Sequence, residues 1–314
     1  MNIKQLCYGL STLIPGLANF HGRGTGGTNS ARYCFSVWLR HLVLAWENGL
    51  VTDVPEVVGE LGPGDSVGIG LAALLSGTEH YYGMDVVAHA SMQKHVAMLS
   101  ELVELFERRA DIPDEREFPN LKPELPAYTF PFRLLTEELL CASLAPKRIE
   151  KIERSLEDCD APGSMIKYAA PWYNDIVIEN ESVDMIYSQA VLEHIDDLRG
   201  TYRAMFSWLK RGGCLSHQVD FKSHELTAEW NGHWTISDAM WKLMRGRRAY
   251  LLNREPHSTH LRMLAECGFK VFRDQTFVLP SRLERRQLAQ RFREMSADDL
   301  NTAGAFIQAR KPLS

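Results

Sequence analysis

Apolar residues recur at helical spacing near the amino-terminal end of the chain, after a segment rich in glycine. Between residues 31 and 50 the spacing predicts a helix, and Gly49 marks its end. The preceding segment, residues 21–28, contains too much glycine for regular structure, so we expect either a flexible connector or a lid over a site. Residues 1–52 are therefore predicted to form an amino-terminal loop and helical cap.

The pattern then changes to short apolar runs that end in turns. Residues 57–61 are apolar or small and lead directly into Gly62-Pro-Gly-Asp-Ser66, after which helical spacing resumes. A second run, residues 80–85, ends at Asp85. A strand, a glycine turn, a helix and another strand are the opening of a parallel nucleotide-binding unit.

A long segment separates this unit from the next strand. About 80 residues lie between Asp85 and the strand pattern at 165–169, whereas a simple crossover needs only a few dozen. Helical patterns occur within it, at about 90–109, 134–144 and 147–156. We expect residues 105–162 to be a helical insertion that is either a structural subdomain or dimer contact, or part of a substrate pocket.

The alternation of strands and helices continues to the end of the chain. The predicted elements are a strand at 183–188, a helix at 198–209, a turn at Gly212-Gly213 into a strand at 214–221, a helix at 261–267, and strands at 269–278 and 305–309. This pattern predicts an α/β fold with a doubly wound, mostly parallel seven-stranded Rossmann-like sheet. The domain built on this sheet would then comprise residues 53–314.

The composition limits the partners of the protein. Of 314 residues, 45% are hydrophobic and 24% charged, which is typical of a soluble globular protein, and the net charge of -5 gives no attraction for nucleic acid. The six cysteines have no CxxC spacing, and no run of about 18 uncharged apolar residues occurs. We expect a cytoplasmic protein without a membrane span, and the sequence leaves open whether it forms a homo-oligomer.

Several of these segments together resemble the class I S-adenosylmethionine-dependent methyltransferases. Glu60-Leu-Gly-Pro-Gly-Asp-Ser66 is similar to their first motif, and Asp85 stands where their ribose-binding acid lies. Residues 181–194 are similar to the motif around strand four, and residues 209–215 and 264–269 to two later turns. The resemblance covers residues 55–100 and 160 to the end, and implies S-adenosyl-L-methionine as the cofactor.

The first motif would bind the methionyl part of that cofactor. Gly62 and Gly64 permit a tight turn and a close approach of the backbone, so that amides meet the carboxylate. Glu60 would accept a hydrogen bond from the ammonium group.

The second strand would bind the nucleoside. Asp85 supplies a bidentate acceptor for the two ribose hydroxyls, and Met84 and Val86 flank it as apolar neighbours of the adenine. Three further residues complete the cofactor-binding set that we predict: Ser66, Trp172 and Ser188.

The acceptor is constrained by what the chain lacks. No Asp or Asn followed by Pro-Pro and an aromatic residue comes after strand four, and no Pro-Cys dipeptide occurs, which excludes two classes of nucleic-acid methylation. Methylation of a small molecule remains, most simply on a hydroxyl. Four residues are candidates for the catalytic group that takes the acceptor proton: His194, His217, Asp220 and His224.

The segment His217-Gln-Val-Asp-Phe-Lys-Ser-His224 has three interpretations. His217 or His224 would act as a neutral base oriented by Asp220, or the three side chains would ligate a metal, or they would be polar loop residues bonded to the backbone. No helix places the three on one face and no second motif completes a ligand shell, so we expect no metal.

The stretch between strands five and six suggests a carbohydrate. Trp230, Trp234, Trp241 and the arginines of residues 245–248 suit a sugar face and an anionic group, although core packing would use the same tryptophans. The order of His217, Asp220 and His224, then these tryptophans, then Asn253-Arg254 and His257 is similar to a bacterial group of methyltransferases associated with surface polysaccharides.

The predicted function is methyl transfer from S-adenosylmethionine to a hydroxyl of a small polar acceptor, such as a sugar or glycan. One alternative is a nicotinamide-dependent oxidoreductase, which Val67 opposes because a third glycine is expected at that place. The other alternative is a non-catalytic partner protein that binds S-adenosylmethionine.

Overall fold

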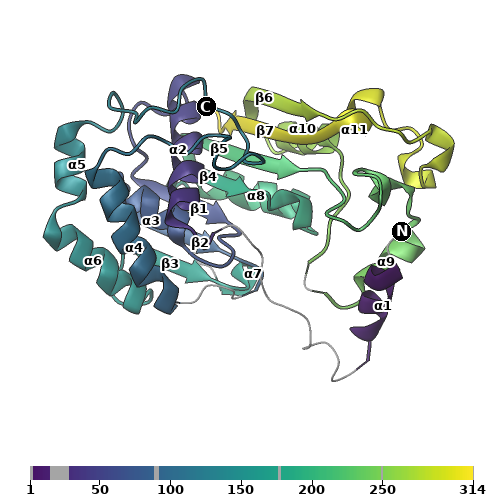
Figure 1. The fold of residues 1–314 in the computed structure, drawn as a ribbon, viewed down its shortest axis with the longest axis horizontal. Helices are drawn as coiled ribbons and strands as arrows, with labels where there is room; N and C mark the ends of the chain where they lie inside the picture. Colours follow the sequence, from purple (N-terminus) through teal and green to yellow (C-terminus); the bar gives the residue numbers. More distant parts are fainter. Residues whose placement is uncertain (1–2, 15–27, 88–91, 176–177, 249, 314) are drawn as a thin grey trace.

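The computed structural model describes residues 3–14, 28–87, 92–175, 178–248 and 250–313 (Figure 1). The glycine-rich segment 21–28, predicted to be a connector or a lid, lies outside these residues except for Thr28. No helix within the described ranges is both long enough and apolar enough to cross a membrane.

Seven strands form a single sheet in the order β3-β2-β1-β4-β5-β7-β6. Their bounds are β1 Val57–Leu61, β2 His80–Met84, β3 Ile166–Ala169, β4 Val183–Gln189, β5 Leu209–Asp220, β6 Lys270–Val278 and β7 Thr302–Arg310. β7 pairs antiparallel with both β5 and β6, and the other neighbours are parallel. The predicted doubly wound, mostly parallel seven-stranded sheet is confirmed.

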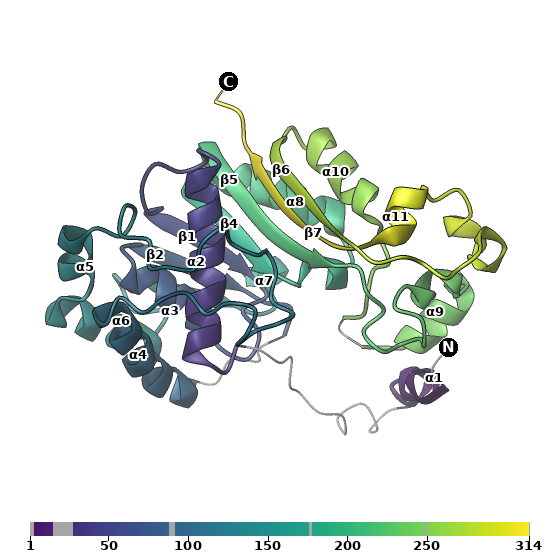
Figure 2. The ribbon, with the colours of Figure 1, turned by 45° about the horizontal axis from the view of Figure 1, so that its top comes forward.

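Helices cover both faces of this sheet (Figures 1 and 2). The α-helices are α1 Ile3–Ser11, α2 Ala31–Glu47, α3 Gly68–Leu75, α4 Met92–Glu107, α5 Glu137–Ser143, α6 Pro146–Glu157, α7 Trp172–Asp175, α8 Leu198–Trp208, α9 Asp238–Arg245, α10 His257–Glu266 and α11 Ala297–Asn301. Short 3-10 turns are η1 Leu192–His194, η2 Gly232–Thr235, η3 Arg285–Gln287 and η4 Gln290–Phe292.

The alternation of side chains along β4 divides the core into two layers. Met185 and Tyr187 pack in the apolar cluster that contains α2, α3 and α4. Ile186, between them, packs in the cluster that contains α8 and α10. This period of two is what a strand buried on both faces requires.

Helix α2 is buried along most of its length, because it lies between the sheet and the predicted insertion (Figure 2). The Arg40 side chain is fully buried and donates hydrogen bonds to the carbonyl groups of Pro113, Leu121 and Pro123. Residues of the insertion from Leu121 to Leu156 belong to the same apolar cluster as α2. The insertion is therefore part of the core rather than a separable appendage.

The prediction of a turn at Gly212-Gly213 before strand five is wrong. β5 already begins at Leu209 and contains both glycines. Its register with β4 shifts between the pairs Val183–Leu209 and Met185–Cys214, which breaks the regular pairing there. Gly212 has φ +79° at this irregularity, so the glycines absorb the extra residues within the strand.

Candidate functional site

A pocket of about 320 Å³ opens where β1, β2 and β4 end. The strand order reverses between β1 and β4, and ligands of open α/β sheets bind at this crevice. The lining residues come from the ends of the three strands and from later loops: Thr28, Tyr33, Leu61, Gly62, Pro63, Gly64, Ile69, Met84, Asp85, Val86, Trp172, Gln189, Ala190, Val191, His194, Ile195, His224 and Tyr250.

The glycine turn after β1 has the conformation that its sequence predicts. Gly62 and Gly64 have φ +65° and +75°, a region that favours glycine. The Gly62 amide donates to the Met84 carbonyl at 2.7 Å, and a Cβ at Gly62 would lie 2.6 Å from Val191 Cγ2. A side chain at this position would therefore move Val191, which itself lines the pocket.

The carboxylate of Asp85 is held at the carboxyl end of β2. Its Oδ2 accepts from the Gly64 amide at 3.2 Å and its Oδ1 from the Val86 amide at 2.7 Å. Trp172 approaches from the other side, where its amide donates to the Asp85 carbonyl at 2.9 Å. Asp85, Met84, Val86 and Trp172 all line the pocket. An acidic acceptor between apolar side chains fits an adenosyl group, with the acid toward the ribose.

Glu60, predicted to meet the cofactor ammonium, lies outside this pocket. Strand alternation turns its side chain to the opposite face from its neighbour Leu61. Its Oε2 accepts hydrogen bonds from the Tyr81 and Tyr187 hydroxyl groups at 2.7 and 3.2 Å. Burial raises the pKa of Glu60 to about 8, and the neutral acid does not supply the negative charge that the prediction requires.

Two predicted serines are also placed beneath the pocket rather than in it. The hydroxyl of Ser66 donates to the Thr28 carbonyl and so ties the glycine turn to the start of α2. The Ser188 hydroxyl lies 2.8 Å from His217 Nδ1, inside the sheet. Both side chains are fully buried, so they support the site instead of lining it.

The four candidates for the catalytic base separate into two groups. His217 is only 1% exposed, lines none of the pockets described, and has its pKa lowered to about 3 by burial. His224 and Asp220 come after it, and their Nε2 and Oδ2 atoms are 3.6 Å apart. The ring of His194 lies 5.2 Å from that of His224, centroid to centroid. The structure thus brings together His194, Asp220 and His224, but not His217.

The environment of this group favours a neutral imidazole. Burial, and then the nearby His224, lower the pKa of His194 to about 4. Burial alone would raise the pKa of Asp220, but its hydrogen bond with His224 and the charge of Lys222 outweigh burial and hold the pKa below its usual value. A neutral imidazole and an ionised carboxylate therefore meet at this edge of the pocket at neutral pH.

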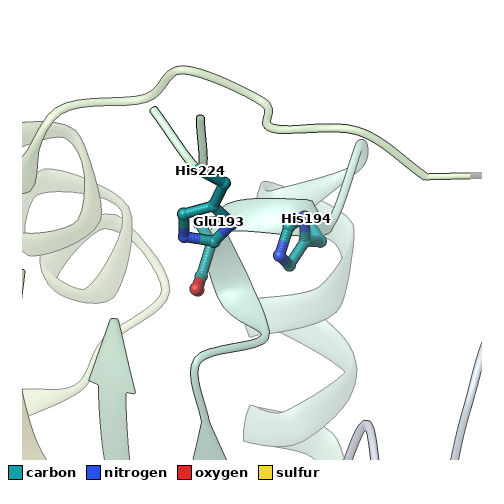
Figure 3. A group of neighbouring side chains, drawn as sticks. All are labelled: Glu193, His194 and His224. Carbon is teal, nitrogen blue, oxygen red and sulfur yellow. The ribbon is translucent and has the colours of Figure 1, made fainter. Parts of the chain in front are cut away.

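Glu193, which no sequence pattern singles out, joins this group (Figure 3). Ligand atoms of Glu193, His194 and His224 all lie within 4.8 Å of one another. Burial, and then the Asp220 carboxylate, raise the pKa of Glu193 well above its usual value. Glu193 is adjacent to His194 in the sequence, and this adjacency could have drawn attention to it. That the two side chains share one site depends on the 3-10 turn Leu192–His194, which the sequence does not reveal.

A second pocket, of about 780 Å³, adjoins the first and shares Tyr33, Gln189 and Ala190 with it. Residues 117–122 of the insertion form one wall. The rest of the lining comes from Gln218, Asp220, Lys222 and residues at the adjoining ends of β6 and β7. No local pattern predicts this pocket, because its walls come from segments far apart in the sequence.

Two of the three tryptophans considered for a sugar face, Trp234 and Trp241, serve the core instead. Trp234 and Trp241 are buried, and their indole NH groups donate to the carbonyl groups of Arg254 and Leu252. Arg245 forms an ion pair with Asp196. A carbohydrate acceptor therefore gains no support from these residues.

Comparison with known proteins supports a methyltransferase. A family described as a methyltransferase domain matches residues 127–216, which contain β3, β4, α8 and the first part of β5. No curated protein matches the chain. The match supports a class I S-adenosylmethionine-dependent methyltransferase with S-adenosylmethionine as its cofactor, and it does not favour the nicotinamide-dependent alternative.

The chain is also similar in structure to solved methyltransferases. An S-adenosylmethionine-dependent methyltransferase from Methanosarcina mazei is 12% identical over 85% of this chain and 97% of that chain, with a TM-score of 0.45. One from Mesorhizobium loti is 14% identical over the same shares, with a TM-score of 0.40. Phosphoethanolamine N-methyltransferase 2 of Haemonchus contortus, solved with S-adenosyl-L-methionine, is 14% identical over 90% of this chain and 56% of that chain, with a TM-score of 0.43.

Proposed function

We propose that the protein transfers a methyl group from S-adenosylmethionine to a hydroxyl of a small polar acceptor bound in the second pocket. The observation that carries this proposal is the wall that the two pockets share, Tyr33, Gln189 and Ala190. A cofactor in the first pocket and an acceptor in the second would meet there, and proximity and orientation supply much of the rate of such a transfer.

In the reaction, the acceptor oxygen attacks the methyl carbon in line with the carbon–sulfur bond. A carbon–oxygen bond forms, the carbon–sulfur bond breaks, and S-adenosylhomocysteine leaves. The hydroxyl proton must go to a neutral base. His194 and His224 line the first pocket and Asp220 the second, so this group lies where that proton is released.

The second pocket suits a polar acceptor with several hydroxyl groups, as in a sugar or glycan. Lys222, Asp220 and Gln218 offer donors and acceptors on one side. Asn120, from the insertion, also lines this pocket.

A screen of acceptors that follows S-adenosylhomocysteine tests the proposal. Calorimetry should show binding of S-adenosylmethionine but not of NAD, and turnover should appear with hydroxylated acceptors. Binding of the cofactor without turnover on any acceptor class would favour the non-catalytic partner protein instead.

A pair of lysine variants then locates the acceptor. Lys222 forms an ion pair with Asp220 in the second pocket, and Lys210 forms a similar pair with Asp184 near the start of β5. Lys222→Met should raise the acceptor KM with cofactor affinity unchanged, whereas Lys210→Met should change neither. Equal KM values in the two variants would place the acceptor elsewhere.

A further inference from the structure

Unpartnered polar atoms converge at the junction of η1 and the loop after β5. Glu193 is 3% exposed, and no side chain among the described residues donates a hydrogen bond to its carboxylate, which only the backbone amides of Glu193 and Asp220 approach. Nδ1 of His194 and Nδ1 of the buried His233 also have no hydrogen-bond partner among the residues that the structure describes. A buried polar group without a partner is costly, and a carboxylate especially so, which calls for a ligand at this point.

Space adjoins this group on two sides. A cavity of about 10 Å³, close to the volume of one water-sized sphere, lies on the side of Glu193 and is also lined by Asp220 and His233. His194 and His224 border the larger cofactor pocket on the other side. A ligand held here would therefore contact both the interior of the protein and the reaction site.

The donor set points to a transition metal. Imidazole nitrogens suit zinc, iron, cobalt and nickel, whereas magnesium and calcium prefer oxygen ligands alone. Two imidazoles and one carboxylate lie within 4.8 Å of one another (Figure 3), so small movements of the side chains would close a tetrahedral or octahedral shell with positions left open.

Asp220 lies beside His224 and can orient this histidine from outside the set of metal ligands. Its Oδ2 lies 3.6 Å from His224 Nε2, and carboxylates commonly orient metal-bound histidines in this way. His217, which the sequence grouped with these residues, is bonded to Ser188 instead and takes no part.

We propose that Glu193, His194 and His224 bind a divalent transition-metal ion at the edge of the cofactor pocket, with Asp220 positioning His224. Binding of the ion does not depend on the proposed function. Its use does: the ion would hold the acceptor oxygen near the methyl group and lower the pKa of that hydroxyl, whose proton would pass to solvent water before the transfer, so that the two histidines need not accept it.

Titration of the metal-free full chain with Co²⁺, without cofactor or acceptor, tests the binding. We expect saturation at one equivalent with visible d–d absorption, and displacement by Zn²⁺. Glu193→Gln and His224→Asn should each lower the affinity on the order of 100-fold. Asparagine is chosen because His224 has φ +46°, a conformation that asparagine tolerates.

The matched control is His257→Ala. His257 pairs with Asp274 at 2.7 Å, an imidazole–carboxylate contact outside the cluster, so its loss should leave Co²⁺ affinity unchanged. Far-UV circular dichroism shows whether each variant is folded. If the wild type shows no saturable binding, or if folded Glu193→Gln and His224→Asn bind as tightly as the wild type, the metal site is refuted.

Chelation separates the ion's use from the methyl transfer itself. Loss of turnover in EDTA, restored by a divalent ion, supports the role proposed for the ion. Turnover that persists in EDTA, in a protein shown to have lost its ion, would refute that role. The histidines would then again be the groups that accept the acceptor proton. Absence of turnover on every acceptor, with Co²⁺ binding intact, would refute the proposed function and leave the metal site standing.

Discussion

The backbone amide of Gly64 donates to Oδ2 of Asp85 at 3.2 Å, and this contact joins the glycine turn after β1 to the end of β2. The glycine turn and Asp85 are thus held together by two hydrogen bonds, since the Gly62 amide also donates to the carbonyl of Met84, the residue before Asp85. A change at either end should therefore affect the same ligand.

Replacement of Asp85 tests the cofactor site. In Asp85→Ala, the ribose loses its acceptor, and loss of a charge-assisted hydrogen bond costs about 1.5 to 3 kcal/mol, or roughly tenfold or more in affinity. Calorimetry with S-adenosylmethionine measures the change. Asp53→Ala, at an exposed aspartate outside the pocket, is the control. An unchanged affinity in folded Asp85→Ala protein would show that the cofactor binds elsewhere.

Replacement of Gly62 tests the close approach of the turn. Gly62→Ala should weaken cofactor binding, because its Cβ would lie 2.6 Å from Val191 Cγ2 and the residue has φ +65°. The double variant with Val191→Ala should recover part of the loss, since it restores the space but not the backbone preference. Additive losses in calorimetry would instead mean that the two side chains do not interfere.

The sequence predicts the frame of this site better than its chemistry. The glycine turn and Asp85 are local features of a strand and its end, so a single sequence reveals them. Which face Glu60 occupies depends on how β1 packs between the two layers of helices, and strand alternation alone cannot decide it. The group of Glu193, His194 and His224 forms only where η1 meets a loop about 30 residues later in the chain.

The protonated state of Glu60 predicts an unusual dependence of stability on pH. The pKa of Glu60 is about 8 in the folded protein and 4.5 ordinarily, so the folded state binds this proton more tightly than the unfolded state. Its contribution is complete below about pH 4.5 and is lost as the pH rises through 8, at about 1.4 kcal/mol per pH unit.

Glu60→Gln removes this dependence, because the amide keeps an acceptor for Tyr81 without titrating. Between pH 5 and pH 8 the free energy of unfolding in urea should therefore fall in the wild type relative to that of Glu60→Gln, so that the difference between the two proteins changes in favour of the variant. Glu56→Gln, at an exposed position, should follow the wild type throughout. Parallel curves for Glu60→Gln and the wild type would mean that Glu60 is ionised in the folded protein.

His217 should matter for stability rather than for turnover. It lies outside both pockets, and burial lowers its pKa to about 3, so the stability it contributes is present above pH 6.5 and is lost as the pH falls toward 3. His217→Gln should keep kcat within about threefold of the wild-type value. Its free energy of unfolding should fall less steeply than that of the wild type as the pH drops from 6.5 to 4. A loss of kcat on the order of 100-fold, in a folded variant, would restore His217 as the base.

Arg40 should connect the stability of the insertion to acceptor binding. Its buried guanidinium holds the carbonyl group of Leu121, within the segment 117–122 that lines the second pocket, and those of Pro113 and Pro123, which flank this segment. Arg40→Met leaves these carbonyl groups without their donor, and we expect a loss of roughly 3 kcal/mol in the free energy of unfolding. The acceptor KM should rise while the affinity for S-adenosylmethionine, measured by calorimetry, stays the same.

The control for Arg40 is Arg133→Met, which also removes an arginine between the insertion and α2. Arg133 is exposed and lies over the Trp46 ring at 5.3 Å, so its loss should cost less than about 1 kcal/mol and leave KM unchanged. If Arg40→Met destabilised the protein but left the acceptor KM as it is, the insertion would be a structural element alone. The acceptor would then contact the other walls of the pocket, formed by the ends of β5, β6 and β7.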